Sequence, residues 1–230
     1  MTTNIALVPA RGGSRRIPRK NLKEFLGVPA IARVIATLQQ SGIFDRIVVS
    51  TDDQEIAGVA RHAGADVPGR RPDDLADDLA TTTEVVRHAI DAWLGDLEAD
   101  ARLWTVYPTA VLLTSKTLGT ARAMFEAAGP DFLIPVLRYA HPVERRLRAA
   151  AGGLLIPDEP PALQARSQDL EPAFHDSGQF YVGTIHAWQQ FTPLASGRNL
   201  AFELPAGSAI DIDEPAHWEL AERLALESHS

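Results

Sequence analysis

Residues 4–21 read Asn-Ile-Ala-Leu-Val-Pro-Ala-Arg-Gly-Gly-Ser-Arg-Arg-Ile-Pro-Arg-Lys-Asn. The apolar run at residues 4–8 is typical of a short buried strand, and apolar side chains at helical spacing predict a helix over residues 30–40. The loop between them, residues 9–21, combines adjacent glycines with a cluster of arginine and lysine side chains. A strand, a glycine-bearing loop and a helix in this order are typical of an α/β fold.

Strands and helices continue to alternate after this unit. Further strands are predicted at residues 46–50, 103–107, 131–137 and 179–183, and further helices at residues 53–62, 83–97, 118–127 and 215–226. Such alternation implies a parallel sheet flanked by helices. The alternation of strands and helices stops at residues 139–175, where prolines are scattered. This part is therefore predicted to be an insertion of extended segments. With 230 residues, the chain has the length of one globular domain, residues 1–230.

The composition excludes several classes of function. A net charge of -8 argues against a general nucleic-acid binder, and the lack of cysteine excludes disulfides, thiolate metal sites and a cysteine nucleophile. The apolar run at the amino terminus is far shorter than the ~20 residues of a membrane span, and no signal-peptide pattern follows it. We therefore expect a cytoplasmic protein that has neither nucleic acid nor a membrane as its partner.

The positive charge of this acidic chain is concentrated in the first loop. Arg11, Arg15, Arg16, Arg19 and Lys20 follow the first predicted strand, and open parallel sheets bind ligands beyond the carboxyl ends of their strands. Arginine suits multidentate phosphate contacts and glycine lets the backbone approach closely, so the loop is suited to a triphosphate. It has neither the GxxxxGK[ST] pattern of P-loop NTPases nor the GxGxxG pattern of dinucleotide enzymes. The alternative is an exposed basic loop without a ligand.

A pair of aspartates near the carboxyl terminus is the second feature. In the segment Ile210-Asp211-Ile212-Asp213, both carboxylates point to one side of the chain if the segment ends a strand. Mg²⁺ prefers a few carboxylates together with phosphate oxygens and water, which favours a metal that bridges the protein and a triphosphate. Capping of the following helix by Asp213 is an equally weighted alternative.

Other polar segments have structural explanations of equal or greater weight. Helix capping is the preferred interpretation of Asp52 and Asp53, and a loop that leads into a capped helix is preferred for residues 71–83. Residues 166–169 and 175–181 carry polar side chains suited to a charged, hydroxylated sugar, although a surface loop explains them as well.

Taken in order, several segments resemble the acylneuraminate cytidylyltransferase family, whose members make CMP-activated nine-carbon acidic sugars. The similar segments are residues 9–14 and 17–21, Val-Ser-Thr-Asp-Asp at 49–53, Arg71-Pro72 and Asp211-Ile-Asp213. The resemblance implies a Rossmann-like, mostly parallel sheet flanked by helices, Mg²⁺ as the cofactor, and CTP and an acidic nine-carbon sugar as partners. It also implies a homodimer in which the inserted segment, residues 139–175, covers the sugar site of the partner subunit.

Within this family, two segments are most similar to the branch that acts on pseudaminic acid. These are Arg166-Ser-Gln-Asp-Leu170 and His175-Asp-Ser-Gly-Gln-Phe-Tyr181, and sialic and legionaminic acids are the alternative substrates. Enzymes that activate the eight-carbon sugar Kdo usually have Gly-Lys-Pro where this chain has Arg19-Lys20-Asn21. The chain departs from the family at Arg15, commonly a lysine, and at Val111, usually a proline.

The resemblance implies a role for each matching residue. The implied catalytic phosphate contacts are Arg11, Arg15 and Lys20, and the implied Mg²⁺ ligands are Asp211 and Asp213. The implied nucleotide contacts are Ala10, Arg11, Gly12, Gly13, Ser14, Asn21, Arg71, Thr82 and Thr109. The implied sugar contacts are Arg145, Arg166, Gln168, His175 and Tyr181. The expected reaction is attack of the sugar's anomeric hydroxyl on the α-phosphorus of CTP, which releases pyrophosphate.

Two further classes of function are consistent with parts of the pattern. A nucleotide-sugar glycosyltransferase also uses an Asp-x-Asp motif, but that motif normally lies near mid-chain, whereas here it precedes the last predicted helix. A non-catalytic nucleotide-binding module is expected to lose the aspartate pair or Lys20, and this chain has both.

Overall fold

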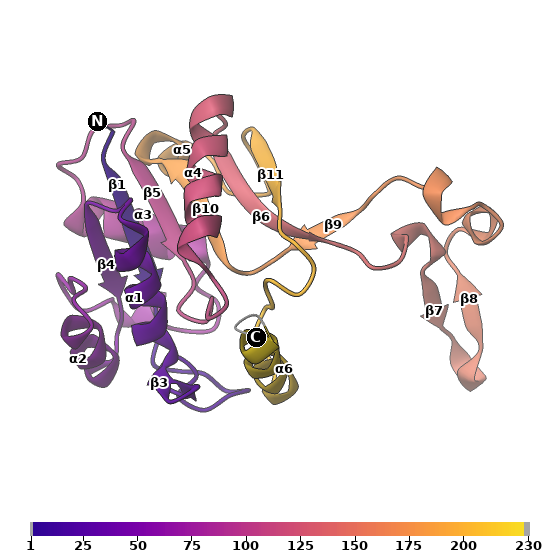
Figure 1. Ribbon diagram of the computed structural model, residues 1–230, viewed down its shortest axis with the longest axis horizontal. Coiled ribbons are helices and arrows are strands. Elements are labelled where there is room, and N and C mark those ends of the chain that lie inside the picture. Colours follow the sequence, from indigo (N-terminus) through magenta and orange to yellow (C-terminus); the bar gives the residue numbers. More distant parts are fainter. Residues whose placement is uncertain (1, 228–230) are drawn as a thin grey trace.

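The protein is built around one twisted sheet, seen in the computed structural model (Figure 1), which describes residues 2–227. Residues 1 and 228–230, which the single-domain prediction also includes, lie outside the described residues. The strand order is β11-β6-β10-β5-β1-β4, and β9 also pairs with β6. These strands are β1 (Asn4–Pro9), β4 (Arg46–Ser50), β5 (Arg102–Val106), β6 (Phe132–Arg138), β9 (Phe174–Asp176), β10 (Phe180–Thr184) and β11 (Asn199–Glu203).

The sheet is mixed: the side formed by β5, β1 and β4 is parallel, and the strand next to it, β10, is antiparallel. β1 pairs in parallel with both β4 and β5, and β11 pairs in parallel with β6, whereas β10 runs antiparallel to β5 and β6. The predicted α/β class is therefore confirmed. Strand β11 was not predicted, because its residues alternate only between exposed and half-buried positions and so carry a weak apolar signal.

Helices cover both faces of the sheet. They are α1 (Ala30–Ser41), α2 (Gln54–His62), α3 (Thr82–Trp93), α4 (Ser115–Ala128), α5 (Ile185–Gln190) and α6 (Pro215–Glu227). Alternate residues of β1 separate the two main clusters of the core, because successive side chains of a strand point to opposite faces. Ala6 and Val8 pack with α1, α2 and α4, while Ile5 and Leu7 pack with α3 and α5.

A third apolar cluster joins the end of the chain to the beginning. Phe25 lies in the short hairpin of β2 (Glu24–Phe25) and β3 (Val28–Pro29). Trp218 of α6 packs edge-on against it, with ring centroids 5.8 Å apart. Ile17 of the basic loop and Ile212 are buried in the same cluster. Burial of these two side chains therefore brings the aspartate pair beside the basic loop.

The chain between β6 and β9 leaves the body of the protein and projects from it (Figure 1). Its centre is a hairpin of β7 (Leu147–Ala149) and β8 (Leu155–Pro157), in which the Asp158 carboxylate pairs with Arg146 and Arg148. Large apolar side chains are exposed along this arm, residues 139–173: Tyr139, Leu147, Leu154, Leu155, Ile156 and Leu163. The segment predicted as an insertion, residues 139–175, also contains the first two residues of β9, which pair with β6 in the main sheet.

Within residues 2–227, no helix combines the length and the apolar character that crossing a membrane requires.

Replacing Gly183 with alanine should destabilise the sheet. An added Cβ at this position of β10 would lie 2.6 Å from ring atoms of Phe132 and 3.1 Å from the carbonyl oxygen of Asp131. We expect the free energy of unfolding, measured by urea denaturation, to fall by about 1–3 kcal/mol. Gly119→Ala in α4 is the control, because an added Cβ there has no neighbour within 4 Å and alanine favours a helix. Equal unfolding midpoints for the two variants would contradict this prediction.

Candidate active site

A polar cavity of about 250 Å³ lies where β1, β4 and β5 end. Because these strands are parallel, the loops that follow them meet at one edge of the sheet. The cavity is lined by Pro9, Arg11, Lys20, Asn21, Arg71, Leu75, Asp77, Asp78, Ala80, Thr82, Val85, Tyr107, Pro108 and Thr109. The structure thus brings together most of the side chains that the sequence assigned to the nucleotide.

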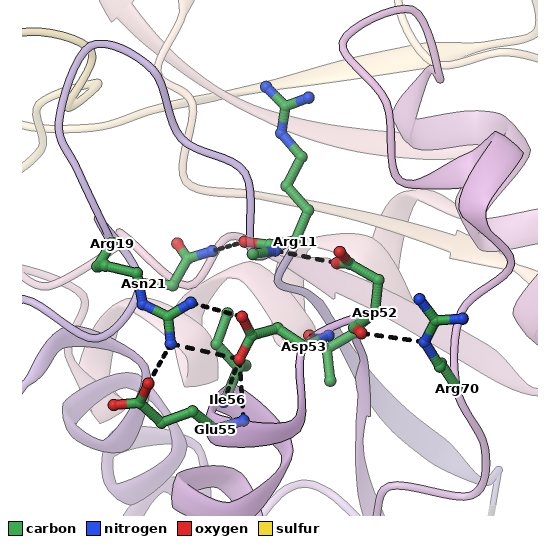
Figure 2. Close-up of polar contacts among 10 residues, drawn as sticks. Arg11, Arg19, Asn21, Asp52, Asp53, Glu55, Ile56 and Arg70 are labelled. Carbon is green, nitrogen blue, oxygen red and sulfur yellow. Dashed lines mark hydrogen bonds and ion pairs between the residues drawn. The ribbon is translucent and has the colours of Figure 1, made fainter.

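The basic loop is fastened to the end of β4. The amide of Ala10 donates to the carbonyl oxygen of Ser50 over 2.9 Å, and the amide of Gly12 donates to Oδ1 of Asp52 over 2.9 Å. The side-chain amide of Asn21 reaches back to the carbonyl oxygen of Arg11, also at 2.9 Å, as Figure 2 shows. The loop therefore has a defined shape that its own hydrogen bonds maintain.

The remaining loop residues lie outside the cavity lining. The described residues that line the cavity do not include Ala10, Gly12, Gly13, Ser14 or Arg15. Ala10 is fully buried and serves the backbone pairing with β4, whereas Gly13 is exposed. Their predicted contacts with the nucleotide and its phosphates stay predictions.

Asp53 caps a helix, as the sequence suggested. Its Oδ1 accepts hydrogen bonds from the amides of Glu55 and Ile56, at 2.9 and 3.0 Å, at the start of α2. Thr81 caps α3 in the same way and forms a reciprocal capping box with Glu84. The capping interpretation is confirmed for Asp53 and for the loop before α3, whereas the Asp52 side chain accepts the amide of Gly12 instead. The cap of α3 places Thr82 in its first turn, facing the cavity.

Asp78 holds two of the loop's arginines at the mouth of the cavity. Nη1 of Arg11 lies 2.7 Å from Oδ1 of Asp78, and Nη2 of Arg15 lies 2.8 Å from Oδ2. Arg11 also donates to the carbonyl oxygen of Asp77 over 2.7 Å. An incoming phosphate group would compete with this exposed carboxylate for the same guanidinium groups.

Arg71 is a buried charge at the base of the cavity. Its side chain donates to Oγ and to the carbonyl oxygen of Ser50, and to the carbonyl oxygen of Leu75. Burial lowers the pKa of Arg71 to about 10, so the guanidinium stays protonated at neutral pH. The arginine therefore contributes a fixed positive charge that three hydrogen bonds to Ser50 and Leu75 hold in place.

Lys20 connects the basic loop with the aspartate pair. Its Nζ donates to the carbonyl oxygen of Ile212 over 2.7 Å and lies 3.7 Å from Oδ1 of Asp213. Burial lowers the pKa of Lys20, and the charges of Asp213 and Asp211 act in the opposite direction. These residues are far apart in the sequence, and the packing of Ile17 and Ile212 brings them together.

The condition that a strand ends at the aspartate pair is not met. β11 ends at Glu203, and Pro205 follows, which has no amide to donate to a sheet. Residues 209–213 run without regular structure, and the side-chain amide of Gln179 donates to the carbonyl oxygen of Ile210 over 3.1 Å. The two aspartates nevertheless face the same region, next to the basic loop.

The surroundings of Asp211 and Asp213 suit a divalent cation. Asp211 packs so tightly on Gly178 that a Cβ added at Gly178 would lie 2.8 Å from Cγ of Asp211. Burial and the neighbouring charge of Asp213 raise the pKa of Asp211. Oδ1 of Asp213 lies 3.0 Å from Nη2 of Arg16. Within the described part of the chain, no group of three or more histidine and acidic side chains is placed to hold a metal ion. A cation here would therefore need further oxygen ligands from a substrate and water.

A chain of hydroxyl groups leads from the cavity toward these carboxylates. Thr82 Oγ1 and the Tyr107 hydroxyl share a hydrogen bond of 2.9 Å, and the Tyr107 ring packs edge-on against Tyr181 at 5.9 Å. The Tyr181 hydroxyl donates to the carboxylate of Asp176. Burial raises the pKa of both tyrosines, so both remain neutral hydrogen-bonding groups.

Sequence reasoning missed Tyr107, Asp176 and Asp78 as members of the site. Tyr107 directly follows β5, and Asp176 ends β9, so position beyond a strand was the available signal for both. Asp78 had no such signal, because only the fold brings residues 76–80 over the basic loop.

None of the predicted sugar residues is among the described residues that line the cavity. Tyr181 lies on β10 in the body, and His175 is exposed on β9, with its ring 5.0 Å from that of Tyr139. Arg145, Arg166 and Gln168 lie on the projecting arm. Arg145 is used within the arm itself, where it donates to the carbonyl oxygens of Ala162 and Ala165.

Similarity to known proteins agrees with this geometry. The family model described as Cytidylyltransferase matches residues 5–144. The chain belongs to the cytidylyltransferase family. The predicted resemblance is confirmed, and this membership favours an enzyme over a glycosyltransferase or a non-catalytic module.

Curated relatives of this cytidylyltransferase align with it along nearly its whole length. It is 37% identical to a pseudaminic acid cytidylyltransferase of Campylobacter jejuni subsp. jejuni, over 98% of this chain and 97% of the relative. It is 31% identical to a CMP-N,N'-diacetyllegionaminic acid synthase of Legionella pneumophila, over 96% and 95%. A solved structure of a CMP:2-keto-3-deoxy-manno-octonic acid synthetase complexed with CTP covers 99% of this chain with a TM-score of 0.71 and 17% identity, which confirms the fold.

Proposed function

We propose that this cytidylyltransferase transfers CMP from CTP to the anomeric hydroxyl of a nonulosonic acid and releases pyrophosphate. The observation that carries the proposal is the single cavity in which Arg11, Lys20 and Arg71 converge, with an aspartate pair beside it. The names of the curated relatives support CTP and a nonulosonic acid as substrates, and pseudaminic acid is the favoured one.

The proposed catalysis is electrostatic. Displacement at the α-phosphorus of CTP moves negative charge onto the departing pyrophosphate, and Arg11, Arg15 and Lys20 would stabilise that charge. Arg11 and Lys20 line the cavity, and Arg15 pairs with Asp78 at its mouth. Lys20 is half-buried and fixed by the carbonyl oxygen of Ile212, so little reorganisation is needed when charge develops. Arg71, Asn21, Thr82 and Thr109 would hold the rest of the nucleotide in the cavity.

We propose Mg²⁺ as the cofactor, with Asp211 and Asp213 as its protein ligands. The ion would neutralise phosphate charge and complete its coordination with phosphate oxygens and water. Arg16 and Lys20 already balance the Asp213 carboxylate, and a bound cation would take over that role. The use of CTP also leads us to propose that the protein works in the cytoplasm.

We propose a homodimer in which each arm covers the sugar site of the other subunit. The arm exposes Leu147, Leu154, Leu155 and Ile156, and a surface of this kind favours contact with another protein surface. Arg166 and Gln168, on the same arm, would then reach the partner's cavity. Such an arrangement gives these residues a role that the geometry of one chain does not provide.

The first test is pyrophosphate release by the purified protein in the presence of Mg²⁺. CTP is compared with ATP, GTP and UTP, and pseudaminic acid with sialic, legionaminic and Kdo sugars. We expect release with CTP and pseudaminic acid, because two relatives that are 37% and 36% identical over 98% of this chain are named pseudaminic acid cytidylyltransferases. Turnover with CTP and a different nonulosonic acid would support the proposed reaction and refute the choice of pseudaminic acid. No pyrophosphate release with any pair of substrates would refute the proposed reaction.

Asp211→Asn should impair the metal site without unfolding the protein. We expect kcat to fall by at least about 100-fold and the Mg²⁺ concentration for half-maximal rate to rise, because one anionic ligand is lost. Asp66→Asn is the matched control, since this half-exposed aspartate pairs with Arg46 on the surface. Wild-type activity with an unchanged Mg²⁺ requirement in Asp211→Asn would disprove the ligand assignment.

The shared site can be tested by mixing two inactive variants. Arg166→Ala removes an arm residue and Lys20→Met removes a cavity residue, so a heterodimer of the two retains one intact site. After subunit exchange, equal amounts should recover about a quarter of the wild-type activity. Failure to recover any activity from a verified heterodimer would show that each chain builds its site alone.

A further inference from the structure

One arginine of the basic loop faces away from the cavity. Arg19 extends its guanidinium toward the start of α2, where Nη1 lies 2.5 Å from Oδ2 of Asp53 and Nη2 pairs with Glu55 (Figure 2). The arginine is therefore engaged by two carboxylates, and it is not among the described residues that line the cavity. Its charge is used within the protein rather than offered to a phosphate.

Both ends of the basic loop meet at Asp53. Arg19, near the end of the loop, pairs with Oδ2. Gly12, near its start, packs on the same side chain so closely that a Cβ there would lie 2.7 Å from Oδ2. The neighbouring Asp52 accepts the amide of Gly12 over 2.9 Å. The carboxylates after β4 thus close residues 12–19 into a loop of fixed span.

The backbone of Arg19 makes the turn that directs the next two side chains. Its φ of 54° is left-handed, and its carbonyl oxygen accepts the amides of Leu22 and Lys23 over 2.8 and 2.9 Å. Directly after this turn, Lys20 reaches the carbonyl oxygen of Ile212, and Asn21 reaches that of Arg11. A non-glycine residue rarely adopts this conformation unless surrounding contacts stabilise it.

We propose that Arg19 is a positioning residue, whose ion pairs with Asp53 and Glu55 hold the turn that presents Lys20 and Asn21 to the nucleotide. This inference rests on the proposed roles of Lys20 and Asn21. The hydrogen bond from Arg19 also lowers the pKa of Asp53, so the pair is fully charged at neutral pH. The contact is partly exposed, and salt should weaken it.

The test compares Arg19→Gln, Arg19→Gly and Arg19→Lys with a matched control, Arg70→Gln. Arg70 contacts the other side of Asp52, donating from Nε to its carbonyl oxygen over 3.2 Å, and lies outside the loop (Figure 2). For each full-length variant, titration calorimetry gives the dissociation constant for CTP, and pyrophosphate release gives kcat and the KM for the sugar. Urea denaturation gives the unfolding midpoint.

We expect Arg19→Gln and Arg19→Gly each to lower kcat about tenfold or more and to weaken CTP binding about tenfold, with the sugar KM changed less than about twofold. Glycine adopts the left-handed turn freely, so a defect in Arg19→Gly assigns the effect to the ion pairs rather than to the turn. Arg19→Lys should recover part of the loss, because it keeps the charge without the planar fork. Arg70→Gln should match the wild type.

Wild-type kcat and CTP affinity in Arg19→Gln or in Arg19→Gly would overturn the inference. A kcat loss that comes with an equal rise in sugar KM and a lower unfolding midpoint would also overturn it, because general destabilisation would explain both. If the wild type releases no pyrophosphate, the proposed function fails and the CTP titration decides the inference alone. If the wild type does not bind CTP, both fail.

Discussion

The parallel pairing of β1 with β4 and β5 is the constraint on which the site depends. It places the ends of these strands at one edge of the sheet, so that the basic loop, the aspartates after β4 and Tyr107 after β5 become neighbours. The strands themselves are held by apolar side chains on both faces, beginning with Ala6 and Leu7. A polar cavity is thereby built on the rigid edge of a close-packed core.

Charge balance within the site follows from this arrangement. This acidic protein has four arginines in one loop, and the fold surrounds that loop with carboxylates: Asp53 and Glu55 on one side, Asp78 across the cavity and Asp213 from the end of the chain. Opposed charges hold each cation in a definite direction before a substrate arrives. Preorganised charge of this kind is worth more to catalysis than flexible charge, because it need not reorient as the reaction proceeds.

Much of the fold was predictable from the sequence, because its signals are local. Apolar spacing identified α1, α3 and α6 and the central strands, and capping by Asp53 followed from an aspartate directly before a helical pattern. β11 was not predicted, because an exposed edge strand has few buried apolar residues to reveal it in the sequence. No strand forms at Asp211: Ile212 is buried with Trp218 in the third cluster, and Pro205, which follows β11, has no amide to donate to a sheet.

The sequence by itself determined the α/β class, the chemistry of the basic loop and the family resemblance, since each depends on residues that are close together or on motifs in order. Only the tertiary structure decided which way each charge points. Arg11 and Lys20 face the cavity, Arg19 turns to α2, and Arg145 braces the arm. These directions are set by partners distant in the chain, such as Asp53 for Arg19 and Ile212 for Lys20, and no local pattern encodes a contact that exists only after the core has packed.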